Sequence, residues 1–383
     1  MKIIPLIMVL CMTLLPAPGC GRPEKKVTPS GKIIRIGVIG PLSGPFSNQG
    51  KRGFEGLKAA RKIQPLLRNG DALEFVAEDD QEGPSRTIAA LRKLIEIDKV
   101  AAVLIFSDSA SVLKLKAFAD RFRTPIIAII ATHPDINKNN NYITQLCYDD
   151  VFQGSVAALF VRDELLFEKV AIVDNSENPF SVRLAAEFRQ KFESTGGQVT
   201  EVVSLTDEVD DLSAIMEILR LKKTQLLYMP VKAKRFINLV KATQNIKWYP
   251  KIMGSDGLLS TVLAEYPDDR EFMEGLLGTD FFGNQIIQTK YAKRLEKMYA
   301  SLFHHPVGRF SALGSEAYTI LCDAMNRCRV PGNRQEINEK LRQTTDFIGM
   351  SGKMTITKEG KTIRPLFVKA IEDGKLKVIV KVY

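Results

Sequence analysis

Short apolar runs alternate along the chain with longer stretches in which apolar residues recur every three or four positions. From Ile33 onward the runs IRIGVIG, LEFVAE, AAVLIF and PIIAII are typical of strands buried in a parallel sheet. The stretches between them are typical of helices with one apolar face, as at Ile88, Leu91 and Ile95. Because each such helix covers the sheet that its strand leaves, the pattern predicts a doubly wound α/β fold.

The same alternation restarts after CYDDVFQG, with strands expected at KVAIVD, QVTEVVSL, QLLYM and KIMG. A further strand, LLGTDFF, two long helices and three closing strands, MTIT, RPLFVKAI and LKVIVKV, complete the chain. We therefore predict two Rossmann-like lobes joined by a hinge, with a ligand cleft between them. The N-terminal lobe is expected to contain residues 33–150 and 284–353, and the C-terminal lobe residues 151–280 and 358–383.

The first 19 residues are interpreted as a signal peptide. A positive start, Met1-Lys2, precedes an apolar run that is short and broken by proline. The run ends at APGC, which resembles the cleavage site of bacterial lipoprotein signals and would make Cys20 the lipid-modified first residue. Residues 20–32 then form a polar, flexible tether. An ordinary secretory signal or an uncleaved anchor is the alternative.

Charge and cysteine content exclude several classes of function. The net charge of +10 is spread over helices that also contain Asp and Glu, without a basic stripe interleaved with aromatic residues, so no nucleic-acid binding is expected. Cys147, Cys322 and Cys328 are an odd number, so we expect buried free thiols and no disulfide framework. No Cys/His metal spacing or catalytic triad pattern is found, and we expect no cofactor, no metal and no enzymatic activity.

Ligand sites of doubly wound sheets lie beyond the carboxyl ends of the strands, so four loops are candidates. GPLSGPFSNQG lacks the nucleotide-binding glycine and lysine motifs; its small residues either shape a turn or let a ligand approach the backbone. In FSDSAS, Ser109 or Ser111 is favoured as the N-cap of the following helix, and the alternative is a carboxylate site.

The third and fourth loops also offer polar groups. In IIATHPD, Thr132 supplies a hydroxyl and an amide, while His133 is expected to be structural. In GSDGLLS, Asp256 either caps the next helix or binds an ammonium group or another cation. The residues alone do not decide between these two roles.

Taken in order, these segments resemble the type I periplasmic solute-binding proteins, specifically the leucine/isoleucine/valine branch that serves ABC importers, in its lipoprotein form. The resemblance covers nearly the whole chain after Cys20. It is carried by IGPLSGP, LEFVAEDDQEGPSRTIAALRKLI, RTPIIAIIATHP, CYDDVFQG, KVAIVDN and GSDG.

The resemblance implies a site for an amino acid. The hydroxyls of Ser109 and Thr132 would bind its α-carboxylate, and the Ile130 carbonyl and the Asp256 carboxylate would receive its ammonium group. Two weaker assignments complete the pocket: Gln49, where the family often has an aromatic residue, and Phe180, which matches an expected aromatic only if an insertion is allowed. These departures make a polar amino acid, an amide or another small carboxylate as defensible as leucine.

The implied function is capture of an amino acid or similar small zwitterion in the periplasm or cell envelope, and its delivery to an ABC permease. The protein would be a monomer anchored to a bacterial membrane through its lipid. The alternative is a lipoprotein of the same fold that does not transport, and instead activates a partner such as a cell-wall synthase or senses a ligand.

Overall fold

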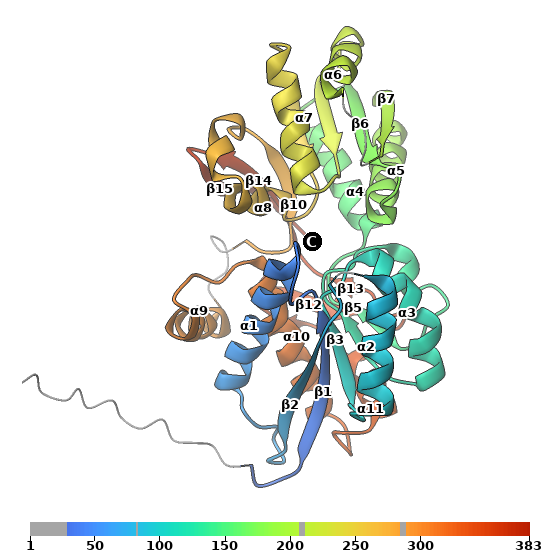
Figure 1. The fold of residues 1–383 in the computed structure, drawn as a ribbon, viewed down its shortest axis with the longest axis vertical. Helices are drawn as coiled ribbons and strands as arrows, with labels where there is room; N and C mark the ends of the chain where they lie inside the picture. The colour runs from blue at the N-terminus through green and yellow to red at the C-terminus, as the bar shows by residue number, and fades with distance from the viewer. Residues whose placement is uncertain (1–28, 82, 207–210, 284–288) are drawn as a thin grey trace, which may run out of the picture.

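The computed structural model describes residues 29–81, 83–206, 211–283 and 289–383. The predicted signal peptide and most of the predicted tether, including Cys20, lie outside these described residues. The chain forms two lobes stacked along the long axis, each built around its own twisted sheet with helices on both faces (Figure 1). We call them the N-lobe, which contains the first strands of the chain, and the C-lobe.

The N-lobe sheet is wholly parallel, with strand order β2-β1-β3-β4-β5. Its strands are β1 (Ile33–Gly40), β2 (Ala72–Asp79), β3 (Ala102–Ile105), β4 (Ile126–Ala128) and β5 (Ile143–Gln145). The helices around it are α1 (Ser47–Ile63), α2 (Pro84–Glu96), α3 (Ser109–Phe122), α9 (Lys290–Phe303), α10 (Arg309–Asn326) and α11 (Arg334–Leu341). A small antiparallel sheet adds β11 (Phe347–Ile348), β12 (Lys353–Ile356) and β13 (Thr362–Ile363).

Alternation along β1 shows how the N-lobe core is divided. Ile36 and Val38 belong to the core cluster that contains residues of α1 and α10, whereas Ile39 belongs to the cluster formed with α2 and α3. Successive side chains of a strand point to opposite faces, so one apolar run supplies two cores. This is why the strand has a continuous apolar pattern in the sequence.

The C-lobe repeats this plan. Its sheet order is β15-β14-β10-β9-β8-β6-β7, in which β6 to β10 are mutually parallel, β14 pairs antiparallel with β10, and β15 pairs antiparallel with β14. The strands are β6 (Lys169–Asn175), β7 (Gln198–Leu205), β8 (Leu226–Met229), β9 (Lys251–Gly254), β10 (Leu277–Asp280), β14 (Leu366–Glu372) and β15 (Lys375–Val382). The helices are α4 (Asp150–Leu159), α5 (Pro179–Ser194), α6 (Leu212–Leu221), α7 (Ala233–Asn245) and α8 (Leu258–Glu265).

The chain crosses between the lobes three times: at 146–149, between β10 and α9, and at 364–365. Buried groups tie these crossings to one another. Arg364 donates from Nη1 to the carbonyl of Leu146 at 3.1 Å and from Nη2 to Oε2 of Glu316 on α10 at 2.9 Å. The rings of Tyr148 and Phe281 stack with their centroids 4.4 Å apart. The described parts of the three crossings are therefore packed and hydrogen-bonded to one another, and we call them the hinge.

The sequence missed the shortest elements. β5 has only three residues and joins the sheet through Ile143, and a π-helical turn, Phe160–Glu164, follows α4 without a visible sequence signal. Among the described cysteines, Cys147 and Cys322 are buried free thiols as expected, whereas Cys328 is only partly buried. Within the described residues, no helix is long and apolar enough to cross a membrane, and no group of His, Cys, Asp and Glu side chains could hold a metal ion.

Glycines allow α1 and α10 to pack in backbone contact. A Cβ placed on Gly314 would lie 2.1 Å from the carbonyl oxygen of Gly53, and one on Gly56 would lie 2.1 Å from that of Ser311. These distances are too short for any side chain unless a helix moves. Since α1 begins at Ser47, within the first candidate loop, the position of that loop depends on this contact.

We expect Gly314→Ala to destabilise the protein by about 1–3 kcal/mol, the usual effect of overpacking a core. Urea unfolding followed by circular dichroism would measure this. Gly308→Ser is the matched control, because a Cβ at Gly308 meets nothing within 4 Å and serine is a favourable N-cap. Equal stability of the two variants would contradict the close helix contact.

Candidate ligand site between the lobes

Ser109 is the first residue of α3 and is almost fully buried, with 4% of its surface exposed. Its Oγ accepts hydrogen bonds from the backbone amides of Thr132 at 3.2 Å and His133 at 3.3 Å. The prediction that a serine caps this helix is wrong. Asp108 is the N-cap and accepts from the Ser111 amide at 2.9 Å, because a carboxylate both fills the cap and complements the helix dipole. Ser109 instead connects the start of α3 to the Thr132 loop through these two hydrogen bonds.

Thr132 follows β4 and lies next to the start of the C-lobe. It is 1% exposed, and its carbonyl accepts from the amide of Asp150, the first residue of α4, at 3.0 Å. Asp149 caps α4 by accepting from the Phe152 amide and also binds Nζ of Lys361 at 2.6 Å. Asp150 is consequently not needed as a cap, and its carboxylate is buried beside the Thr132 hydroxyl.

Asp256 follows β9, and the structure decides against its helix-capping role. Gly257 occupies the N-cap position of α8, and no side chain caps that helix. Arg309, at the start of α10 in the N-lobe, donates to the Asp256 carbonyl at 3.0 Å and to Oγ1 of Thr261 at 3.1 Å. Glycine is required at position 257 for two reasons. Its φ is +61°, which favours glycine, and a Cβ there would lie 1.4 Å from Nη1 of Arg309.

Several buried polar atoms around these residues have no hydrogen-bond partner among the described residues. They are Oδ1 of Asp256, both carboxylate oxygens of Asp150, Oε1 of Gln153 and the hydroxyls of Tyr148 and Tyr228. An unpaired buried polar group costs about 1–3 kcal/mol. Native proteins contain few such groups, so a cluster of them between two lobes points to a polar occupant, and most of these atoms call for hydrogen-bond donors.

Both acids of this cluster have raised pKa values. Burial raises the pKa of Asp256 to about 6, against the opposing effects of Arg309 and of a hydrogen bond from Gln153. Burial also raises the pKa of Asp150 well above its usual value, with the Thr132 hydroxyl opposing and the Asp256 charge adding to the rise. The pKa of Tyr228 is raised by burial and then by both acids. Titratable groups with strongly perturbed pKa values in a cleft are typical of functional sites.

The sequence did not identify Asp150, Gln153, Tyr148, Tyr228 or Arg309 as members of this cluster. The segment CYDDVFQG contains three of them, and in the sequence only its family resemblance distinguishes it. Of the predicted residues, the structure joins Ser109 directly to Thr132 and places Asp256 within the electrostatic reach of Asp150. Ile130 and Phe180 are partly buried and pack against the largest core cluster, and Gln49 is partly exposed in the first turn of α1. The ligand roles of all six positions remain predictions.

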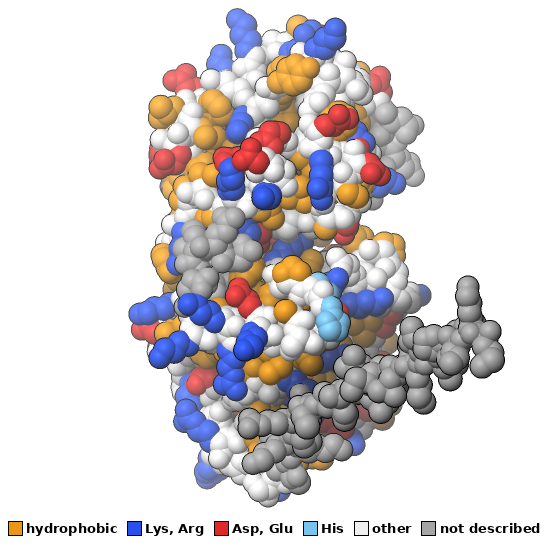
Figure 2. All heavy atoms as spheres, turned by 90° about the vertical axis from the view of Figure 1, so that its left-hand side faces the viewer, with side chains coloured by type: hydrophobic (Ala, Val, Ile, Leu, Met, Phe, Trp, Pro, Cys, Tyr) orange, Lys and Arg blue, Asp and Glu red, His pale blue; other side chains and the backbone are white. Residues whose placement is uncertain are grey.

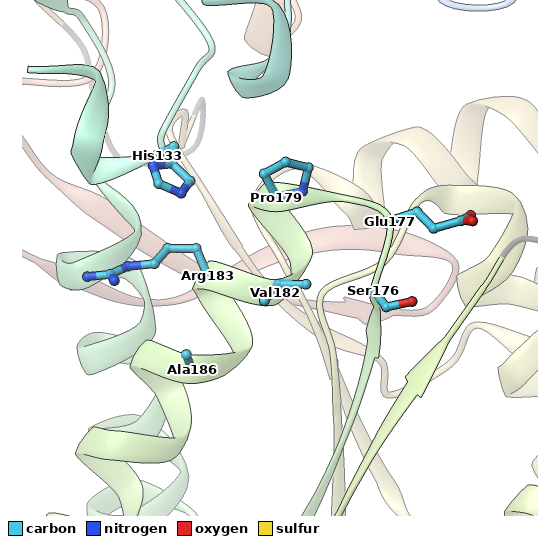
Figure 3. Close-up of a pocket in the computed structure, with 7 residues that line it drawn as sticks. All are labelled: His133, Ser176, Glu177, Pro179, Val182, Arg183 and Ala186. Atoms are coloured by element: carbon cyan, nitrogen blue, oxygen red, sulfur yellow. The ribbon is translucent and has the colours of Figure 1, made fainter. Parts of the chain in front are cut away.

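A pocket of about 420 Å³ opens beside the Thr132 loop, between the two lobes (Figure 3). His133 lines it from the N-lobe, and Ser176, Glu177, Pro179, Val182, Arg183 and Ala186 line it from the C-lobe. Nδ1 of His133 accepts from the Asp135 amide at 3.2 Å, so this histidine has the structural role expected of it. Because the His133 amide also binds Ser109, the pocket adjoins the candidate carboxylate site.

A model of the periplasmic binding protein family matches residues 33–375. The chain belongs to this family. Its fold agrees with a leucine-binding protein from Thermotoga maritima, at a TM-score of 0.84 and 25% identity, covering 91% of this chain and 98% of that one. An isoleucine-bound branched-chain amino-acid binding protein from Streptococcus pneumoniae matches with a TM-score of 0.81 and 20% identity, covering 91% and 100%. The predicted two-lobed type I fold is thus confirmed.

Curated relatives in this family match over shorter stretches. An amino acid binding protein of Pseudomonas aeruginosa is 24% identical over 249 residues, which cover 64% of this chain and 66% of the relative. A Leu/Ile/Val-binding protein of Rhizobium johnstonii is 26% identical over 260 residues, covering 66% of each chain. The matched regions span about half to two thirds of these and similar relatives.

The raised pKa of Asp256 makes stability depend on pH. Because its pKa is about 6 in the folded protein and 3.8 as a free side chain, its favourable contribution is present below about pH 4 and is lost as the pH rises through 6. We expect Asp256→Asn to stabilise the unliganded protein by about 1–3 kcal/mol more at pH 7.5 than at pH 4.5. Urea unfolding at both pH values measures this. Asp268→Asn, on an exposed residue, is the control, and the same effect of Asp256→Asn at both pH values would contradict the assignment.

Proposed function

We propose that the protein is an extracytoplasmic solute-binding lipoprotein that captures an amino acid or similar small zwitterion or carboxylate between its lobes and delivers it to an ABC permease. The observation that carries the proposal is the cluster of unpaired buried polar atoms between the lobes, which includes Asp150 and Asp256. It is supported by relatives named as amino acid and Leu/Ile/Val-binding proteins. In this role the protein binds and releases its ligand without chemical change.

The two ends of a zwitterion have complementary groups in this cluster. The carboxylate would lie at the start of α3 and the Thr132 loop, where Ser109 and Thr132 supply hydroxyls and the helix N-terminus favours an anion. The ammonium group would donate to Asp256 Oδ1 and to the Ile130 carbonyl, forming the stronger, charge-assisted kind of hydrogen bond.

Asp150 adds a function that the family resemblance did not supply. Burial raises the pKa of Asp150, and a neutral Asp150 would donate to the Thr132 hydroxyl, which leaves the hydroxyl proton for the ligand carboxylate. An ionised Asp150 would repel the ligand carboxylate nearby, and its raised pKa reduces that repulsion. We therefore infer that Asp150 orients Thr132 and sets the balance between the two ends of the ligand.

Ligand affinity should reveal this function directly. The first test is thermal unfolding of the chain from Gly21 against a panel of amino acids, amides and small carboxylates. A ligand at a hundred times its dissociation constant adds roughly 2.7 kcal/mol to the stability, a shift that a melting curve resolves. We expect a zwitterionic amino acid among the hits. A well-folded protein that no ligand shifts would reject solute capture in favour of a partner-activating lipoprotein.

Substitutions locate the site once a ligand is known. We expect Ser109→Ala and Thr132→Ala each to weaken binding by about 0.5–3 kcal/mol, the range for losing a hydrogen bond to a charged group. Asp256→Asn should weaken the binding of a zwitterion more than the binding of an analogue without the ammonium group. Isothermal titration calorimetry measures all three, with Ser301→Ala, on the exposed surface of α9, as the matched control. Unchanged affinity of the three site variants would place the ligand elsewhere.

Substitution of Cys20 tests the proposed lipid anchor. We propose that residues 1–19 are removed and that Cys20 carries the lipid at the head of the tether 20–32. Cys20→Ser should move the protein from the membrane fraction to the soluble fraction of a bacterial host, as measured by fractionation and immunoblotting. Cys11→Ser, within the apolar run, should leave it in the membrane fraction. If Cys20→Ser also stays with the membrane, an uncleaved anchor replaces the lipoprotein assignment.

A further inference from the structure

The two lobes have opposite net charges. Residues 29–148 and 289–365, which surround the N-lobe sheets, contain 31 Lys and Arg against 19 Asp and Glu, a net charge of +12. Residues 149–283 and 366–383, which form the C-lobe, contain 19 Lys and Arg against 24 Asp and Glu, a net charge of −5. The positive charge is spread over helices that also contain Asp and Glu, and the fold gathers two separate basic segments into one lobe.

Much of the N-lobe charge lies on one side, where α1 and α9 pack against each other (Figures 1 and 2). We call this surface the basic face. Its exposed cations are Lys58, Arg61, Lys62, Arg68, Lys290, Lys293, Arg294 and Lys297. The acids of α1 and α9 are Glu55, which is engaged by Arg52 at 3.1 Å and by the Tyr299 hydroxyl at 2.6 Å, and Glu296, which is partly buried. The face therefore presents a nearly single-signed charge to its surroundings.

Cations of the basic face differ from those of the C-lobe in whether they form ion pairs with carboxylates. Among the described residues, no carboxylate forms an ion pair with Lys58, Arg61, Arg68, Lys290, Lys293, Arg294 or Lys297. On the C-lobe surface, by contrast, Arg189, Arg220 and Lys222 are each paired with a glutamate. Two basic-face cations lie over aromatic rings instead, Lys58 over Phe54 at 4.4 Å and Arg61 over Phe75 at 5.7 Å.

We propose that the basic face lies against the anionic lipid headgroups of the membrane. The proposal rests on the proposed function, which places the chain at a membrane. Clusters of four to eight Lys and Arg are what anionic bilayers attract, and the attraction acts within about 8 Å at physiological salt. Arg68 and Arg294 line a cavity of about 470 Å³ that also has Asp323 in its wall, which opposes the binding of a small anion there. The other six cations are spread along α1 and α9, which suits a surface of many phosphates better than one small anion.

The length of the tether and the opposite charges of the lobes both agree with an orientation in which the N-lobe faces the bilayer. The 13 residues from Cys20 to Lys32 span at most about 45 Å and lead into β1 of the N-lobe, so the basic lobe is the one held near the bilayer. The same anionic surface repels the acidic C-lobe. Adsorption through α1 and α9 would thus fix one lobe and leave the other to open and close.

Vesicle sedimentation tests the proposal without the lipid anchor. The chain from Gly21, which retains both lobes, is mixed with phosphatidylcholine vesicles, either pure or containing one third phosphatidylglycerol, at low and at physiological salt. We expect binding only to the anionic vesicles and weaker binding at higher salt. The triple variant Lys293→Glu, Arg294→Glu, Lys297→Glu should lower the partition coefficient about tenfold or more.

A matched triple variant in the C-lobe, Lys222→Glu, Lys223→Glu, Lys234→Glu, changes the net charge equally and should retain most of the binding. Equal losses in the two triple variants, or wild-type binding no stronger to anionic than to neutral vesicles, would overturn the proposal. Melting curves with and without an amino-acid ligand are recorded for every variant. A protein that binds its ligand but not the vesicles would refute membrane docking and leave solute capture standing.

Discussion

The buried ion pair between Arg364 and Glu316 is the interaction on which the arrangement of the two lobes depends. Neither side chain has any exposed surface. Glu316 also accepts from the Ser351 amide at 2.9 Å, and Arg364 donates to the Leu146 carbonyl. Removal of either partner would leave an uncompensated charge in the interior, which typically costs about 3–5 kcal/mol. The pair thereby joins the first and third crossings to α10.

The contacts around the first crossing position the candidate ligand site. The backbone carbonyl of Gln145 accepts from the Thr362 hydroxyl at 2.5 Å, and that of Leu146 accepts from Arg364. The ring of Tyr148 stacks on that of Phe281. Asp150 comes directly after these anchored residues and contacts the Thr132 loop. These hinge contacts therefore fix where the C-lobe acid meets the N-lobe hydroxyls.

The sequence predicted what local patterns determine and missed what distant contacts determine. Apolar runs and helical spacing placed the long strands and helices, since burial of one face dictates them. The role of Asp150 depends on Thr132, 18 residues earlier, and Arg309 reaches Asp256 across 53 residues. The cap at Asp108 was missed because serines next to it satisfy the same preference. Charge clustering was missed because α1 and α9, which form the basic face, are far apart in the chain.

Contacts between the lobes shape how ligand binding would be coupled to closure. Arg309 bonds the Asp256 loop, and Nζ of Lys232 lies 4.4 Å from the ring centroid of Phe46 on the facing lobe. Opposing them are the unpaired buried oxygens of Asp150 and Asp256, which favour an open form in which water can reach them. A ligand that supplies hydrogen-bond donors to those oxygens removes the penalty only in the closed form. Its differential affinity for that form, and not its affinity alone, then drives closure.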